Sequence, residues 1–249
     1  MRARLSRRPR RGTTYVDVNR SLRPELAGLL GSLDWDVALL QEAPPRWFDA
    51  LMAATGSAGE RVLTSRNSLP ALRAAIAERN PDLIASNEGG SNVLLVRFPW
   101  RIAATARERL ACLPERRMLL MARIGLPSGE RLVVANTHLS VPATGRGESE
   151  VLHAAAVASE WAAGDPLVLG GDLNLRPADA PAAFDALESR FGLVGPTGPR
   201  SLDHLLVAGL DTLARPAAMP TGARELAEEP GLAIRLSDHA PVTAAFRLR

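Results

Sequence analysis

Apolar positions along the chain follow two different periods. Short continuous apolar runs bounded by glycine, proline or polar residues predict buried strands, whereas apolar residues at spacings of three and four predict helices. The strands predicted in this way cover residues 15–18, 37–40, 93–97, 118–124, 132–137, 166–170, 203–207 and 241–248. The predicted helices cover residues 22–33, a segment from residue 45 to 52, 70–79 and 148–163. The order of these segments indicates a mixed α/β protein.

The turn signals between the strands indicate how they pair. Pro127-Ser128-Gly129 separates two predicted strands, which should therefore form a hairpin. About ten strands, mostly paired as hairpins and interrupted by helices, predict two packed, mostly antiparallel sheets flanked by helices. We expect one domain over residues 14–249, preceded by a disordered basic tail over residues 1–13. No run of 18 apolar residues occurs, so a membrane-spanning helix is not expected.

Charge is distributed unevenly between the tail and the rest of the chain. All 30 basic residues are arginine, and six of them lie in the first 11 residues, where no acidic residue occurs. The remainder therefore has 24 arginines against 27 acidic residues, so the positive net charge does not indicate a basic groove on the folded body. The tail contains an Arg-Arg pair, but polar residues follow it rather than the apolar run of an export signal, so we expect a cytoplasmic protein. A single cysteine, Cys112, excludes a disulfide framework within the chain and a cysteine-based zinc cluster.

Acidic and imidazole side chains recur at the ends of the predicted strands. Ends of strands in layered folds meet at one rim, so groups that are far apart in sequence can share one cleft there. The candidates are Glu42, His138, Asp172, Asn174, Asp203, Asp238 and His239. Carboxylates gathered in one cleft repel one another, and a bound Mg²⁺ or Mn²⁺ would relieve that repulsion. Protonated histidines beside the cation could donate hydrogen bonds to a phosphate oxygen.

Each of these residues also has an ordinary structural explanation. A glutamate at a strand end is usually solvated, Gly170-Gly171-Asp172 could be a turn, and Ser237-Asp238-His239 could be a helix cap or a loop. Independent structural explanations for the whole set are much less probable than a shared site. By strand alternation His204 should point away from the cleft and be structural, and His153 should pack or lie on the surface of a helix.

The same residues resemble a known family. Five motifs occur in the order of the endonuclease/exonuclease/phosphatase superfamily, which includes deoxyribonucleases and AP endonucleases, and the resemblance spans about residues 14–249. The motifs are QE at 41–42, NTHL at 136–139, GGDLN at 170–174, LDHLLV at 202–207 and SDHAPV at 237–242. The resemblance implies a four-layer α/β sandwich and metal-dependent hydrolysis of phosphate esters.

Roles for individual residues follow from this resemblance. Glu42 resembles the principal metal ligand and Asp238 a second carboxylate at the metal site. His138 resembles the histidine that contacts the phosphate or leaving group, and Asp172 the residue that orients or deprotonates water. Asn174 resembles the contact to the scissile phosphate, and Asp203 the carboxylate that orients a histidine, here His239.

The first motif departs from the family pattern. The family usually has a strand that ends in asparagine, whereas this chain reads Tyr15-Val16-Asp17-Val18-Asn19. Aligning the strand ends places Asp17 at the asparagine position, with Asn19 two residues later on the same strand face. Either residue, or both, could belong to the metal shell.

The leading functional hypothesis is a metal-dependent phosphodiesterase or nuclease that uses in-line attack by water. Alternatives are a phosphatase or phospholipid-type diesterase acting on a small or lipid substrate, and a catalytically silent binding domain. The expected partner is a phosphate-ester substrate, with nucleic acid as one candidate, and we expect a monomer. Leu175-Arg176 after Asn174 differs from the pattern of inositol polyphosphate 5-phosphatases, and no aromatic cluster marks an AP-site insertion loop. We expect Arg116-Arg117 to lie on a solvated face rather than to bind phosphate.

Overall fold

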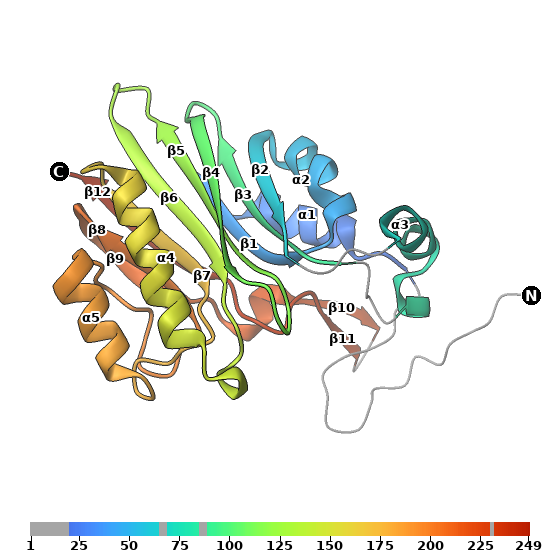
Figure 1. Cartoon of the computed structure of the whole chain (residues 1–249). Coiled ribbons are helices and arrows are strands. Elements are labelled where there is room, and N and C mark those ends of the chain that lie inside the picture. The colour runs from blue at the N-terminus through green and yellow to red at the C-terminus, as the bar shows by residue number, and fades with distance from the viewer. Residues whose placement is uncertain (1–19, 65–68, 85–88, 230–231) are drawn as a thin grey trace, which may run out of the picture.

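The structure is a computed structural model, and it describes residues 20–64, 69–84, 89–229 and 232–249. Two β-sheet layers pack face to face, and helices cover the outer side of each. Figure 1 shows α4 and α5 on one outer side of this sandwich, with α1 and α2 on the other. The order of layers is therefore helix, sheet, sheet, helix, which confirms the predicted four-layer α/β sandwich.

The elements alternate along the chain between strands and helices. The helices are α1 (Arg23–Ser32), α2 (Phe48–Thr55), α3 (Pro70–Arg79), α4 (Gly147–Ala162) and α5 (Pro181–Phe191). The first six strands are β1 (Val37–Ala43), β2 (Ser57–Leu63), β3 (Ser91–Arg97), β4 (Arg101–Ala111), β5 (Arg117–Gly125) and β6 (Arg131–His138). The others are β7 (Leu167–Asp172), β8 (Asp203–Ala208), β9 (Leu210–Ala218), β10 (Glu225–Glu229), β11 (Leu232–Arg235) and β12 (Val242–Leu248).

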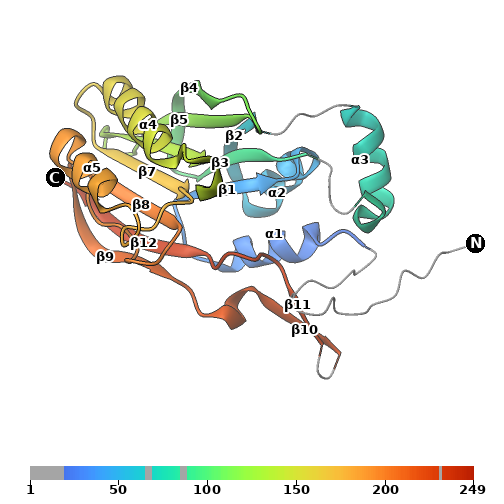
Figure 2. The ribbon, with the colours of Figure 1, turned by 60° about the horizontal axis from the view of Figure 1, so that its bottom comes forward.

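One layer is a five-stranded sheet of order β4-β5-β6-β7-β8. Its neighbours pair in antiparallel fashion except β6 and β7, which are parallel because α4 carries the chain back between them. The other layer contains the sheet β1-β3-β2 and the antiparallel pair β12-β9. A further pair, β10-β11, extends away from the sandwich beyond α1 (Figure 2).

Alternation along each central strand assigns its side chains to two different layers. In β5, Leu119 and Met121 pack against α4 and α5, whereas Leu120 and Ala122 lie between the two sheets. In β3, Val93 and Leu95 likewise face α1 and α2, whereas Leu94 and Val96 face the other sheet. Such strands are buried on both faces, which explains why they read as continuous apolar runs rather than as alternating patterns.

The sequence predicted the buried elements more completely than the exposed ones. All the predicted helices occur with small shifts of their ends, and the hairpin predicted at residues 127–129 joins β5 to β6. The predicted strand at residues 15–18 lies outside the described residues. The strands β2, β4, β9, β10 and β11 and the helix α5 were not predicted. In β4 most side chains are exposed or half-buried, so it has no apolar run to reveal it.

Glycine permits a close approach at the parallel junction of the sheet. Gly171 has φ of 127°, and a Cβ atom added there would lie 1.9 Å from the carbonyl oxygen of Thr137 on β6. No other residue type fits this backbone without moving one of the two strands. The consequence for the site is that the ends of β6 and β7, which carry His138 and Asp172, lie side by side.

Candidate active site

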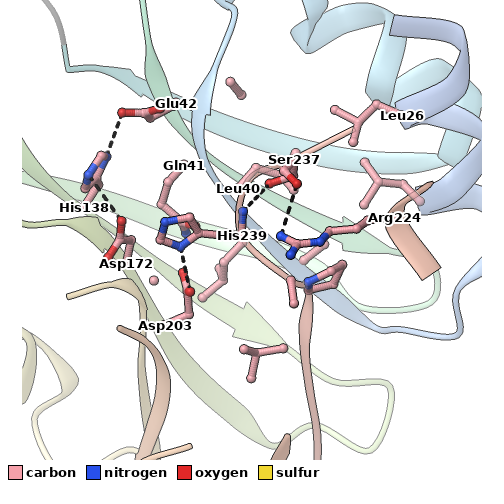
Figure 3. A pocket seen from close by; sticks show the side chains of 18 of the residues that line it. Leu26, Leu40, Gln41, Glu42, His138, Asp172, Asp203, Arg224, Ser237 and His239 are labelled. Carbon is pink, nitrogen blue, oxygen red and sulfur yellow. Dashed lines mark hydrogen bonds and ion pairs between the residues drawn. The ribbon is translucent and has the colours of Figure 1, made fainter. Parts of the chain in front are cut away.

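Neighbouring strands of the five-stranded sheet place the candidate side chains at one edge. His138 ends β6, Asp172 ends β7 and Asp203 begins β8, and these three residues pair directly across the sheet. Glu42 comes from the end of β1 in the opposite layer, and His239 comes from the loop before β12. Figure 3 shows the His138 ring between Glu42 and Asp172, with the Asp203–His239 pair beside them. The expected convergence of these motifs is therefore present in the structure.

Two of the site residues have an unusual backbone conformation. Glu42 has φ of 55° at an irregularity in the pairing of β1 with β3, and Asn174 has φ of 50°. Asparagine tolerates this left-handed region, whereas glutamate adopts it at a cost. The turn at Asn174 is closed by its backbone N–H, which donates to Asp172 Oδ1 at 2.9 Å. The Glu42 side chain lines the groove.

Asp203 and His239 form the shortest contact among the candidate groups. His239 Nδ1 lies 2.7 Å from Asp203 Oδ2. This hydrogen bond is the main reason that the pKa of His239 is raised to about 9, although partial burial opposes the charged form. His239 is therefore an imidazolium at neutral pH, with Nε2 as its remaining donor.

His138 has the opposite protonation state. Burial, followed by the positive charge of Arg117, lowers the pKa of His138 to about 3. Its Nε2 lies 3.5 Å from Asp172 Oδ2 and its Nδ1 lies 3.8 Å from Glu42 Oε1, which are longer than direct hydrogen bonds. The expectation of two protonated histidines is therefore met by His239 and not by His138. A neutral His138 can still donate one N–H to a substrate oxygen.

Asp172 has the properties of a base that works near neutrality. Burial raises the pKa of Asp172 to about 6, while the hydrogen bond from the Asn174 backbone opposes that shift. The carboxylates of Asp203 and Glu42 raise the pKa further. Asp172 is thus ionised above about pH 6, yet is a stronger proton acceptor than a solvated aspartate.

The carboxylates of Glu42 and Asp238 both line the groove and suit a divalent cation. Desolvation and then the negative charge of Asp238 raise the pKa of Glu42. A hard divalent cation beside Glu42 would offset this repulsion and stabilise its ionised form. Asp172, Asp203 and His239 also present ligand atoms within 4.8 Å of one another. Because Asp203 keeps His239 protonated, we consider the Glu42–Asp238 side of the cleft the better fit.

Arg117 corrects the expectation that Arg116-Arg117 lies on a solvated face. The Arg117 side chain is only 8% exposed and pairs with Glu115 at 2.8 Å. Its charge lowers the pKa values of both Glu42 and His138, so the guanidinium is close enough to the cleft to act on both side chains electrostatically. The signal that could have revealed it is strand parity, because Arg117 shares its face of β5 with the buried Leu119 and Met121.

A buried polar network beneath the site was also missed. Gln41 donates from Nε2 to Asn136 Oδ1 at 2.7 Å, and Asn136 Nδ2 donates to the carbonyl oxygens of Leu40 and Val93. Asn136 is fully buried, so the network joins the β1 layer to β6 directly below Glu42 and His138. Asn136, the first residue of the NTHL motif, therefore lies beneath the cleft and supports its neighbours, whereas Gln41 joins this network and also lines the groove.

The other two histidines behave as expected. His204 is buried, stands edge-on to Phe184 and accepts at Nδ1 from the Thr197 backbone N–H, with Nε2 3.0 Å from the Leu175 carbonyl oxygen. His153 is exposed on α4. Asp17 and Asn19 lie outside the described residues, so the choice between them for the first motif stays open.

The candidate residues line one end of a groove of about 620 Å³. Its apolar wall is formed by leucines of α1 and by β1, and β12 and the loop before it border the groove as well. Arg224 also lines the groove and donates from Nη1 to the carbonyl oxygen of Ser237 at 3.1 Å (Figure 3). Within the part of the chain that the structure describes, no helix is long and apolar enough to cross a membrane.

Comparison with known proteins identifies the family. The sequence profile of the Endonuclease/Exonuclease/phosphatase family matches residues 12–239. The chain belongs to this family. Its members hydrolyse phosphate esters, so the expected family is confirmed, and with it the broad class of phosphate-ester hydrolase. No curated protein matches the chain.

Solved structures of the family share the fold at low sequence identity. A mannosyl-6-phosphatase from Bacteroides thetaiotaomicron aligns with a TM-score of 0.67 at 16% identity, covering 90% of each chain. The catalytic domain of human Nocturnin with a bound sulfate anion aligns with a TM-score of 0.58 at 17% identity, covering 86% of this chain and 81% of that one. D. rerio TDP2 complexed with a single-strand DNA product aligns at 0.60 and 14% identity, covering 90% and 91%.

Proposed function

We propose that the protein is a Mg²⁺- or Mn²⁺-dependent phosphodiesterase that uses in-line attack by water, with nucleic acid as one candidate substrate. The observation that carries this proposal is the convergence of three charge arrangements in one cleft. These are a base with a pKa near 6 at Asp172, an imidazolium at His239 and the Glu42–Asp238 carboxylate pair. Each performs a different task that phosphoryl transfer requires.

The bound cation would be held by Glu42 and Asp238, with Asp17 or Asn19 as further candidate ligands. It would supply a Lewis acid that polarises a phosphate oxygen and neutralises the charge that develops there. Asp172 accepts the proton of the attacking water, because it is ionised above about pH 6 and faces the same cleft. Asn174 would contact the scissile phosphate.

The two histidines act on different oxygens. His239, held by Asp203, donates from Nε2 to a phosphate oxygen, and its positive charge stabilises the pentacovalent state. His138 donates a neutral N–H to another oxygen of the phosphate or to the leaving group. The Arg117 guanidinium adds a permanent positive charge beside His138.

The charge of the site favours a diester over a monoester. Glu42, Asp172, Asp203 and Asp238, with Glu115 paired to Arg117, contribute five negative charges when ionised, and Arg117 with protonated His239 contributes two positive ones. One divalent cation leaves a single negative charge on this set, so it has no surplus positive charge for a dianion. A phosphodiester carries a single negative charge and is the better electrostatic match.

The proposal is tested with bis-p-nitrophenyl phosphate and p-nitrophenyl phosphate in the presence of Mg²⁺, Mn²⁺ or EDTA. We expect turnover of the diester that exceeds that of the monoester and that EDTA abolishes. Asp172→Ala is the catalytic control, and His153→Ala, on the exposed face of α4, is the matched control that should stay active. Preference for the monoester would support a phosphatase instead, and absence of turnover on these compounds and on DNA, RNA, inositol phosphates and sphingomyelin would support a silent binding domain.

A further inference from the structure

Glu150 is a buried carboxylate in the first turns of α4. The residue is 4% exposed, and its two oxygens accept hydrogen bonds from one partner, Ser140. Glu150 Oε2 accepts from the Ser140 backbone N–H and Oε1 accepts from the Ser140 hydroxyl, both at 2.8 Å. A buried carboxylate is stable only when its oxygens are satisfied, so this two-point contact fixes Ser140 relative to α4.

Ser140 lies two residues after His138, in the segment that leaves β6. In the residue between them, Leu139, the backbone N–H and the carbonyl oxygen are both hydrogen-bonded. Its N–H donates to the Asp172 carbonyl oxygen at 2.9 Å, and its carbonyl oxygen accepts from Asn174 Nδ2 at 2.9 Å. The segment that carries His138 is therefore tied to β7, to the turn after β7 and to α4, and Glu150 supplies the last of these ties.

We propose that Glu150 is a positioning residue that orients the His138 ring for the reaction, which rests on the proposed function. His138 makes no direct hydrogen bond of normal length to Glu42 or Asp172, so the orientation of its ring depends on the backbone that carries it. Without the Glu150 contact, Ser140 is free to rotate and the buried Ser140 N–H has lost its acceptor. Small displacements of a catalytic group can reduce turnover strongly while substrate binding changes little.

The test compares two Glu150 variants with a control from the same helix. In Glu150→Gln the side-chain oxygen can still accept from the Ser140 N–H and the new amide can donate to the Ser140 hydroxyl, whereas Glu150→Ala removes both contacts. Val151→Ala is the matched control, because Val151 is the next residue of α4 and is fully buried in the core. This variant loses packing but keeps the two hydrogen bonds between Glu150 and Ser140. Each variant is measured for kcat, KM and melting temperature on one diester at saturating Mg²⁺.

We expect Glu150→Ala to lower kcat at least about tenfold with KM changed less than about twofold. Glu150→Gln should stay within about threefold of the original kcat, and Val151→Ala should lose melting temperature but not kcat. A kcat of Glu150→Ala equal to that of Val151→Ala would overturn the proposal, since the residue would then only stabilise the fold. A loss in Glu150→Gln as large as that in Glu150→Ala would overturn it as well.

A second measurement does not depend on activity. Ring ¹⁵N NMR signals of His138 should shift or broaden in Glu150→Ala, and they should be unchanged in Glu150→Gln and Val151→Ala. The buried His204 is the internal reference and should be unaffected in all three. Unchanged His138 signals in Glu150→Ala would overturn the proposal even if the protein hydrolyses diesters. A protein without any turnover would refute the proposed function, and the NMR signals of His138 would then decide the role of Glu150.

Discussion

Replacing Asp203 by asparagine should move the alkaline limit of activity towards neutral pH. The variant keeps a side chain of the same shape beside His239 but removes the negative charge. The hydrogen bond to Asp203 is the largest cause of the raised pKa of His239, and the coulombic effect of the same carboxylate adds to it. We therefore expect the pKa of His239 to fall from about 9 towards the ordinary histidine value of about 6.5.

The size of the effect follows from the protonated fraction of His239. With a pKa of about 9, about 90% of His239 is protonated at pH 8, whereas a pKa of about 6.5 leaves about 3%. Because the reaction needs the imidazolium, kcat at pH 8 should fall about 30-fold. At pH 6 most of the histidine is protonated in both proteins, so the loss from protonation should be less than twofold.

The assay is a pH–rate profile for diester hydrolysis between pH 5 and 10 at saturating cation. The original protein should give a bell, with the acid limb near pH 6 from Asp172 and the alkaline limb near pH 9 from His239. Asp203→Asn should move the alkaline limb from about pH 9 towards about pH 6.5. It should also shift the acid limb to lower pH, because the Asp203 carboxylate raises the pKa of Asp172. Asp211→Asn, at an exposed carboxylate paired with Arg249, is the control and should leave both limbs in place. An alkaline limb that stays near pH 9 in Asp203→Asn would refute the reasoning.

Three further predictions concern the metal, the tail and the histidines. Mg²⁺ or Mn²⁺ should raise the melting temperature, with about 2.7 kcal/mol of stabilisation at a cation concentration 100 times the dissociation constant. Glu42→Gln should abolish this shift. A calorimetric titration that detects no cation binding would contradict the prediction. Deleting residues 2–11 should leave turnover of a small diester within about twofold, because they supply no site residue, while binding of polyanions weakens with a shallower salt dependence. His138→Ala and His239→Ala should each lower kcat by about 10²–10⁴, and His153→Ala should stay near the original value; losses under about fivefold for the first two would refute the site assignment.

The sequence predicts the site residues more completely than the fold that surrounds them. Glu42, His138 and Asp172 could be predicted to meet because each follows an apolar run, and strand ends in a layered protein share an edge. The strands β2 and β4 could not be predicted in the same way, since most of their side chains are exposed or half-buried and neither contains a continuous apolar run.

Protonation states and supporting contacts were beyond the sequence. The neutrality of His138 depends on burial and on Arg117, which is 21 positions away, and neither can be deduced from a motif. The same holds for the Gln41–Asn136 hydrogen bond, which joins residues 95 positions apart. The burial of Arg117 is different: it was not predicted, although its position on the same strand face as Leu119 would have indicated a buried side chain.

At Glu42 the backbone conformation lowers the stability of the fold, whereas the side chain is needed for the proposed activity. A glutamate with φ of 55° costs about 1–2 kcal/mol relative to glycine, which adopts this conformation freely. Glu42→Gly should therefore raise the melting temperature in the absence of cation while eliminating turnover. A screen that selects variants by thermal resistance alone would enrich this substitution, and one that selects by turnover would discard it. Positive φ alone does not identify a functional residue, since Ala163 at the C-cap of α4 has φ of 52° as well; at Glu42 the strained residue is also a carboxylate that lines the cleft.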